Sequence, residues 1–285
     1  MWLRCRLLVV ACLGFAACAG TPRIGVAAFE AIDPLARVEQ IAALGFDYIE
    51  PALGKLAALS DDDLAKARER VRAAGLRAET MNWFVPADVK LTGPTVDDER
   101  VRAWVERALG VAESFGVRVV VFGSPGARSF PDGFPRERAR QQLVAFLRVC
   151  ADVITAHRYG MVIGIEGLRR PESNLVNSVA EAAELARAVD RPQVRIIVDF
   201  YHLTFEHEEI DDVRAAKDWI VHVQIADPAA RAFPRSAANE PRYAQFFAAL
   251  RAIGYTGRVS IEAVSSDFAT DAPASLVFLR TMAAR

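Results

Sequence analysis

The sequence predicts a single (β/α)₈ TIM barrel preceded by an N-terminal signal segment. The main evidence is a pattern that recurs to the end of the chain: a short β-branched run, a loop, and an amphipathic stretch that ends near a glycine. Regular alternation of strands and helices implies parallel strands with right-handed crossovers. The first strand lacks a dinucleotide-type glycine-rich turn, and no linker divides the 285 residues, which favours one closed barrel over an open sheet.

Eight short runs have the composition and length of buried parallel strands. Each is separated from the next by enough chain for a crossover helix. The predicted strands are Arg23–Ala28, Tyr48–Pro51, Arg77–Met81, Arg118–Phe122, Met161–Glu166, Val194–Asp199, Ile220–Gln224 and Arg258–Glu262.

The helices between these strands carry recognisable ends. Ser60 followed by three aspartates predicts a helix start, because acceptor side chains satisfy free amides and carboxylates suit the positive end of the helix dipole. Glycines are expected where helices stop, since they adopt left-handed backbone angles without strain. These positions are Gly45, Gly75, Gly116, Gly160 and Gly254.

Composition and charge narrow the class of protein. With 52% hydrophobic and 25% charged residues, the chain has the balance of an ordinary globular protein. The formal net charge of −1 gives no electrostatic reason to expect nucleic acid or an anionic membrane surface as a partner. A small-molecule substrate is therefore the expected partner.

The first residues have the features of an export signal. Arg4 and Arg6 precede the apolar run Leu7–Ala17, which is too short to span a bilayer and ends in small residues before Cys18. This pattern resembles a bacterial lipobox, with Phe15 at the position usually held by leucine. Residues 1–17 are then a lipoprotein-type signal peptide, and Cys18 carries the lipid. The alternative is a misassigned start codon.

This signal predicts where the protein acts. We expect an exported chain that is lipid-anchored to a bacterial membrane, on its periplasmic or outer face, and that contacts the membrane only through this anchor. Of the four cysteines, only Cys150 would remain as a thiol in the mature protein, where a buried small side chain is the expected role.

Polar residues stand at the ends of the last four predicted strands. Glu166, Asp199, Gln224 and Glu262 each follow an apolar run, and the carboxyl ends of barrel strands meet at one opening. Like charges and burial both raise carboxyl pKa values, so three converging carboxylates need a cation. An all-oxygen ligand set favours Mn²⁺ or Mg²⁺ over Zn²⁺, with Co²⁺ as a plausible substitute.

The segments around these residues resemble the sugar phosphate isomerase/epimerase superfamily, the xylose isomerase-like TIM barrels. Residues 165–177 are similar to the fifth-strand segment of ketose 3-epimerases, and residues 257–262 to their closing strand. Residues 222–227 look like hydroxypyruvate isomerase, in which glutamine replaces the epimerases' metal-binding histidine. The likeness covers residues 18–285 as one domain.

The resemblance implies roles for individual residues. Glu166 and Glu262 are the expected catalytic pair, which also bind the metal, and act through an enediolate. Glu172, His202 and Arg231 are the expected substrate contacts. The last of these comes seven residues after Gln224 rather than the family's six, in a loop that lacks its usual glycine. In addition, Arg169 replaces a usual asparagine.

Several functions fit this pattern. A metal-dependent isomerase or epimerase of a free sugar or keto-sugar is the main hypothesis, because export makes sugar phosphates poor candidates. The same site could serve a dehydratase or lyase on an oxidised sugar, and a non-catalytic sugar-binding lipoprotein is the alternative from another class. Endonuclease IV shares the barrel but uses many histidines, whereas this chain has four. Members of the superfamily that this chain resembles often form dimers or tetramers, so a homo-oligomer is possible.

For other residues near the predicted site, the sequence allows either a role in the site or a role in packing. Glu50, which ends the second strand, lines the cavity or packs in the core. His222 lies two residues before Gln224 and so shares its face one layer deeper, where it supports the site or fills the barrel. Trp83 and Phe84 form either an apolar wall for the sugar or part of the core.

Overall fold

The computed structural model describes residues 20–238 and 240–285. The predicted signal peptide (residues 1–17) and lipidation site (Cys18) lie outside the described residues, so both stay predictions. Within the described part of the chain, the helices are all too short or too polar to cross a bilayer.

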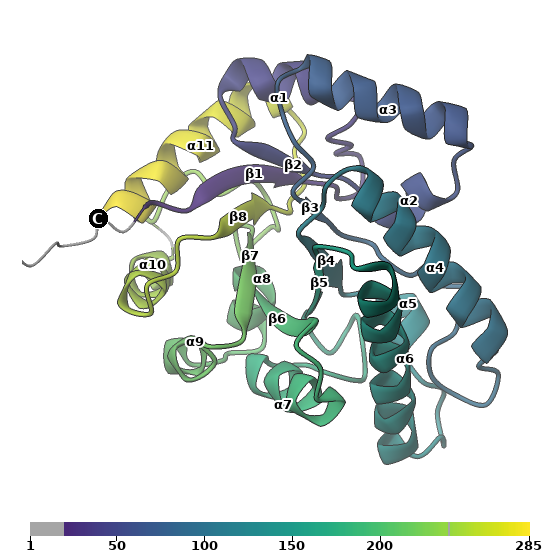
Figure 1. The fold of residues 1–285 in the computed structure, drawn as a ribbon. Helices are drawn as coiled ribbons and strands as arrows, with labels where there is room; N and C mark the ends of the chain where they lie inside the picture. Colours follow the sequence, from purple (N-terminus) through teal and green to yellow (C-terminus); the bar gives the residue numbers. More distant parts are fainter. Residues whose placement is uncertain (1–19, 239) are drawn as a thin grey trace, which may run out of the picture.

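The eight strands form one parallel sheet that curls into a nearly closed barrel (Figure 1). Their order in the sheet is β2-β1-β8-β7-β6-β5-β4-β3, and single bridges from Ile49 to Ala78 and from Ala52 to Asn82 join the two edges. The strands are β1 (Arg23–Ala27), β2 (Tyr48–Glu50), β3 (Thr80–Met81), β4 (Val119–Phe122), β5 (Val162–Ile165), β6 (Val194–Asp199), β7 (Ile220–Ile225) and β8 (Arg258–Ile261).

The predicted strands are confirmed in number, order and position to within a few residues. The largest difference is at β3, which was expected from Arg77 but begins at Thr80. The missing residues still pair with β2, since Ile49 N donates to Arg77 O over 3.0 Å. They make isolated bridges instead of a continuous ladder.

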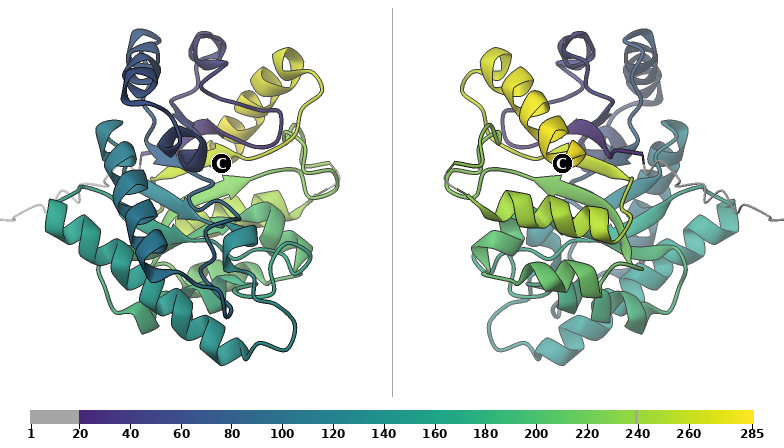
Figure 2. Two further views of the ribbon diagram at one scale, coloured as in Figure 1. Left: turned by 90° about the vertical axis from the view of Figure 1, so that its right-hand side faces the viewer. Right: turned by 90° about the vertical axis from the view of Figure 1, so that its left-hand side faces the viewer.

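The helices surround the barrel in the order in which they follow the strands (Figures 1 and 2). The C-terminal helix contacts β1, and its Arg280 Nη2 donates to Gly45 O over 2.7 Å, which links the two ends of the ring. The helices are α1 (Val38–Leu44), α2 (Leu53–Ala57), α3 (Asp61–Ala73), α4 (Asp98–Ser114), α5 (Pro125–Arg128), α6 (Arg136–His157), α7 (Val179–Val189), α8 (Phe200–Phe205), α9 (Ile210–Ala215), α10 (Arg242–Ala252) and α11 (Phe268–Ala284).

Most of the predicted helix ends are confirmed. Ser60 caps α3, its Oγ accepting from Asp63 N at 3.2 Å. Four of the five glycines have positive φ angles between 71° and 84°. The prediction for Gly160 is wrong, because α6 ends earlier and its left-handed residue is Arg158, at φ 58°. The left-handed conformation is strained for arginine, and the packing of the helix must offset this cost.

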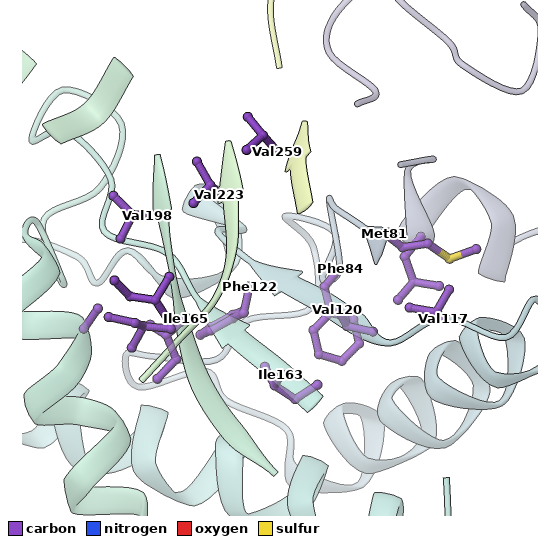
Figure 3. Packing of buried hydrophobic residues seen from close by; sticks show 14 of the residues in the cluster. Met81, Phe84, Val117, Val120, Phe122, Ile163, Ile165, Val198, Val223 and Val259 are labelled. Carbon is purple, nitrogen blue, oxygen red and sulfur yellow. The ribbon is translucent and has the colours of Figure 1, made fainter. Parts of the chain in front are cut away.

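The main hydrophobic core lies between the barrel and the helices. Alternate side chains of the strands point outward into it, so Val120 and Phe122 of β4 pack with Phe146 of α6 (Figure 3). The side chain of Cys150 is fully buried in this layer, as expected.

The inside of the barrel is tightly packed around a polar layer. Tyr48 of β2 points inward over β1, and its hydroxyl lies 2.7 Å from Ser260 Oγ of β8. Its ring covers Gly25 of β1, where a Cβ atom would lie 2.5 Å from Tyr48 Cζ. Glycine at this position is therefore what allows the tyrosine ring to cross the barrel.

Substitution of this glycine tests the packing. Gly25→Ala should destabilise the protein by about 1–3 kcal/mol, because the added methyl group forces the Tyr48 ring or β1 to move. Urea unfolding followed by circular dichroism measures the change. The matched control is Gly110→Ala within α4, where the new Cβ meets its nearest neighbour at an ordinary 3.6 Å and helix propensity predicts slight stabilisation. Equal stability of the two variants would contradict this packing.

Candidate functional site

Four polar side chains converge at the carboxyl end of the barrel. Glu166 and Glu262 directly follow β5 and β8, Asp199 ends β6, and Gln224 is the penultimate residue of β7. All four are at most 6% exposed. The strand ladder holds them in place, because Asp199 and Gln224 are register partners and Glu262 N donates to Ile225 O over 3.1 Å. The structure thus brings together the four residues that the sequence singled out.

Several oxygen atoms in this cluster lack a hydrogen-bond partner. Among the described buried side chains, Glu166 Oε1, Asp199 Oδ2 and Gln224 Oε1 are all unpaired. Leaving buried acceptors unpaired costs free energy, and native structures rarely do so without a reason. Three unsatisfied oxygens on neighbouring strands fit a divalent cation that prefers oxygen ligands.

Glu262 differs from the other three residues because both of its oxygens already have partners. Its Oε1 accepts from Asn82 Nδ2 at 2.9 Å, and its Oε2 accepts from Arg231 Nη2 at 2.6 Å. It therefore stands at the cavity face of the cluster, between the candidate metal ligands and the substrate-facing arginine.

A second carboxylate, Glu50, fixes the orientation of the Gln224 amide. Gln224 Nε2 donates to Glu50 Oε1 over 2.6 Å and to Glu262 Oε1 over 3.4 Å, and Gln224 Oε1 is left without a partner. Because a carboxylate can only accept, the amide group cannot flip without losing the bond. Glu50 lines no part of the open cavity and instead supports the site from the layer below.

Glu50 is fully buried yet stays ionised because four donors surround it. Its second oxygen accepts from Thr80 Oγ1 at 2.6 Å, from Ser260 Oγ, and from His222 Nε2 at 2.7 Å. Burial alone would raise its pKa, but the charge and hydrogen bond of His222 and these hydroxyl groups outweigh it, so the pKa of Glu50 is lowered. His222 is thus a supporting residue, as expected from its position one layer deeper.

His202 lies beside the cluster, with its Nε2 3.5 Å from Glu166 Oε1 and 3.6 Å from Asp199 Oδ2. The three side chains could hold an ion by distance alone. However, His202 Nδ1 accepts from Arg169 N at 3.2 Å, which assigns the ring proton to Nε2. Burial depresses the pKa of His202, so the ring is neutral and presents a donor. This favours contact with a substrate oxygen over metal ligation.

Arg231 bridges the two acidic sides of the cavity. Its Nη1 donates to Glu172 Oε1 over 2.9 Å, while its Nη2 reaches Glu262. The guanidinium group lies between two aromatic rings, 4.0 Å from the centroid of Phe29 and 4.6 Å from that of Tyr201. The loop after β7 therefore delivers this arginine to the site despite its unusual spacing. Glu172 and Arg231 both line the cavity, and the buried His202 lies behind them, with its Nε2 4.0 Å from Glu172 Oε2.

Burial and mutual repulsion raise the pKa values of the clustered carboxyl groups. Burial raises the pKa of Glu166 well above its usual value, and the charges of Glu262 and Asp199 raise it further. Burial likewise raises the pKa of Asp199 to about 7, against the attraction of Arg231. The pKa of Glu262 is raised for the same first reason. Carboxyl groups whose pKa values are raised by burial and by like charges are common at functional sites.

Two residues that hold the site were not identified as such from the sequence. Asn82 follows β3 and donates to Ala28 O and to Glu262 Oε1. It could have been found by reading the ends of the early strands as well as the late ones. Arg128 is fully buried without a carboxylate partner and donates to the carbonyl oxygens of Phe122, Glu166 and Val176, so it braces the backbone at Glu166.

The cluster opens into a cavity of about 910 Å³. One side carries the charged groups, among them Glu166, Glu172 and Arg231. The opposite side is apolar and includes Trp83, which is 51% exposed, whereas Phe84 is fully buried in the core. Of the two residues named after β3, only the first can contact a ligand.

Comparisons with known proteins agree with this geometry. The curated relatives include L-ribulose 3-epimerase of Methylomonas sp. (strain DH-1), which is 30% identical over 79% of this chain and 77% of its own length. A 3-dehydro-D-guloside 4-epimerase of Escherichia coli (strain K12) is 29% identical over 87% of this chain and 94% of its own. These homologues are sugar epimerases, which supports an enzyme of this general kind.

Solved structures and a family model extend the likeness. The 3-keto-D-glucoside 4-epimerase from E. coli is 25% identical, with a TM-score of 0.75 over 91% of this chain and 99% of that one. The D-psicose 3-epimerase from Clostridium cellulolyticum H10 shares the fold, with a TM-score of 0.81 at 21% identity over 92% of this chain and 99% of that one. The model described as "Xylose isomerase-like TIM barrel" matches residues 38–282. The chain therefore belongs to the xylose isomerase-like TIM barrel family.

Proposed function

We propose that the protein is a divalent-metal-dependent epimerase or isomerase of a non-phosphorylated keto-sugar. The observation that carries the proposal is the group of three unpaired oxygens, on Glu166, Asp199 and Gln224, at the carboxyl end of the barrel, where Glu166 and Glu262 line a cavity. A protein that only binds sugars has no need of two buried carboxylates at the reacting position. Curated relatives with epimerase activity support the same conclusion.

The proposed metal ligands are Glu166, Asp199 and Gln224, with Glu262 completing the set. Mn²⁺ and Mg²⁺ suit these oxygen donors, with Co²⁺ as a substitute. Bound there, the cation would supply Lewis acidity that stabilises negative charge on the oxygens of an enediolate.

The protein's own residues would handle the proton. Glu166 and Glu262 come from β5 and β8 and both face the cavity, so one can remove the proton next to the carbonyl group and the other can return it. Return to the opposite face of the same carbon gives epimerisation, and return to the neighbouring carbon gives isomerisation. His202 Nε2, Arg231 and Glu172 would hold the sugar oxygens in position.

The charges around the cavity argue against a sugar phosphate. Among the described residues, the two arginines that line it, Arg169 and Arg231, both already pair with Glu172. A phosphate group near the reacting groups would have to compete with that carboxylate and face the acidic cluster, and Lys55 lines the cavity from α2, on the other wall. The proposed export of the chain as a lipoprotein, anchored through Cys18, would also expose it to free sugars.

Exchange of substrate protons with solvent tests the reaction. We expect the metal-free protein, reloaded with Mn²⁺ in D₂O, to incorporate deuterium next to the carbonyl of a keto-sugar, as followed by NMR. Glu262→Gln should lower the exchange rate by about 10²–10⁴-fold while retaining Mn²⁺ binding, because three ligands remain. The matched control is Glu184→Gln, an exposed position on α7, which should behave as the native protein.

The products separate the remaining functions. Stereochemical inversion indicates an epimerase, carbonyl migration an isomerase, and loss of a hydroxyl or glycosidic oxygen a dehydratase or lyase. Tight Mn²⁺ and sugar binding without exchange on any keto-sugar would instead indicate a binding protein. Full activity of Glu262→Gln would contradict the catalytic assignment.

The carboxyl pKa values predict how stability depends on pH and metal. A carboxyl whose pKa is raised on folding, such as Asp199 from 3.8 to about 7, binds more protons in the folded chain. Raising the pH through this window therefore destabilises the metal-free protein. We expect its melting temperature to fall between pH 5 and pH 8, and Mn²⁺ to raise it most at pH 8. Asp199→Asn should reduce the slope; an unchanged slope would contradict the assigned cause.

The orientation of Gln224 can be tested through its partner. Glu50→Gln keeps the shape of the side chain but offers an amide, which favours a flipped Gln224 with Nε2 toward the metal ligands. We expect Mn²⁺ affinity, measured by calorimetry, to fall at least about tenfold. Thr80→Val removes another donor to Glu50 without touching Gln224, so its Mn²⁺ affinity should change far less. Equal losses in the two variants would mean that the effect is general destabilisation.

A further inference from the structure

We propose that the apolar side of the cavity is a subsite for a second sugar ring, so that the substrate is a keto-disaccharide rather than a monosaccharide. This inference rests on the proposed function and names its substrate class. A cavity of about 910 Å³ lies at the upper end of the range for pockets that enclose drug-sized ligands, and a single hexose would leave much of it unfilled.

The two sides of the cavity differ in chemistry. The reacting groups come from the loops after β5, β6, β7 and β8. The opposite wall comes from the loops after β1 to β4 and from α2. Its lining includes Phe29, Ala58, Trp83, Val85, Pro86 and Ala87. A ligand that fills the whole cavity therefore places its reacting ring at the carboxylates and a second, less polar face against this wall.

Trp83 is held as a rigid platform on that wall. Its Nε1 donates to Ala28 O over 3.2 Å, and its carbonyl oxygen accepts from Gly54 N at 2.9 Å. The backbone adopts a positive φ of 51°, which is costly for a bulky residue and is often found at functional sites. The fold thus keeps a large aromatic side chain half exposed in an unfavourable backbone conformation.

The platform is directly connected to the reacting site. Its neighbour Asn82 donates to Glu262 Oε1, and both Asn82 Nδ2 and Trp83 Nε1 donate to the same oxygen, Ala28 O. Trp83 is therefore the sequence neighbour of Asn82, whose side chain contacts the proposed catalytic carboxylate of Glu262. A ring linked to the reacting sugar can reach it without leaving the cavity.

The chemistry of the wall fits a sugar ring. A pyranose presents a face of C–H groups that packs on an aromatic surface, while its hydroxyl groups project from the edge. Lys55 and Glu30 also line the cavity, where they can bond such hydroxyls, and the open mouth lets others keep their water. An acyl chain has no groups that could bond these two side chains.

A second ring has a consequence for the reacting one. If the linkage is glycosidic through the anomeric carbon of the reacting ring, that ring cannot open to an aldehyde or ketone. The carbonyl group must then be a ketone on the ring itself. Such a ketone has to be supplied by an alcohol-oxidising dehydrogenase with its own electron acceptor, acting on the disaccharide before this protein does.

Paired substrates test the subsite. The measured quantity is kcat/KM for deuterium exchange with a 3-keto disaccharide and with the methyl 3-keto glycoside of the same reacting ring. We expect the native protein to prefer the disaccharide and Trp83→Ala to reduce that preference about tenfold, mostly through KM. Trp83→Phe keeps an aromatic face and should keep most of the preference. Leu59→Ala, on an exposed neighbour outside the cavity, should leave it unchanged.

Binding without turnover separates failure of this inference from failure of the proposed reaction. Calorimetry of Glu262→Gln with the 3-keto disaccharide, with and without Trp83→Ala, reports the subsite alone. Binding that weakens when Trp83 is removed supports the subsite even if no exchange occurs on any substrate. Equal preference for the two substrates in the native protein, or an unchanged preference and affinity in Trp83→Ala, would overturn it.

Discussion

The hydrogen bonds around the buried Glu50 carboxylate connect the barrel to its site. A buried charge is tolerated only where donors surround it, and here they come from Thr80, His222, Gln224 and Ser260, on three different strands. Satisfying Glu50 fixes how these strands meet inside the barrel. The bond from Gln224 Nε2 to Glu50 also fixes the amide group and leaves its oxygen unpaired, so the polar layer that stabilises the barrel also orients a residue of the proposed metal site.

Above this layer, the two walls of the cavity have different proposed roles. The loops after the last four strands supply carboxylates and their partners, which carry the chemistry. The loops after the first four strands supply apolar side chains and the Trp83 platform, which give binding area. Asn82 and Arg231 join the two sides, because both contact Glu262 while one is the neighbour of Trp83 and the other packs on Phe29. A change on the apolar side can therefore reach the reacting carboxylate through these two residues.

The fold and the four converging residues could be predicted because they depend on local patterns. A polar residue that ends an apolar strand must lie at the carboxyl rim of a barrel, whatever the loops do. The role of Glu50 could not be predicted, since it depends on which side chains meet across the barrel from residues far apart in sequence. Helix α6 ends at Arg158 instead of near Gly160 because packing can override the preference for glycine. The exposure of Trp83, against the burial of Phe84, likewise follows from tertiary contacts.

We propose that the unpaired oxygens of this site hold a divalent cation. A crystal of residues 20–285 soaked in Mn²⁺, with anomalous scattering used to locate the metal, tests this. We expect one strong peak at the barrel opening, within about 2–2.5 Å of Glu166 Oε1, Asp199 Oδ2 and Gln224 Oε1. A site that stays empty at saturating Mn²⁺, or a peak ligated by His202 with Gln224 turned away, would contradict it.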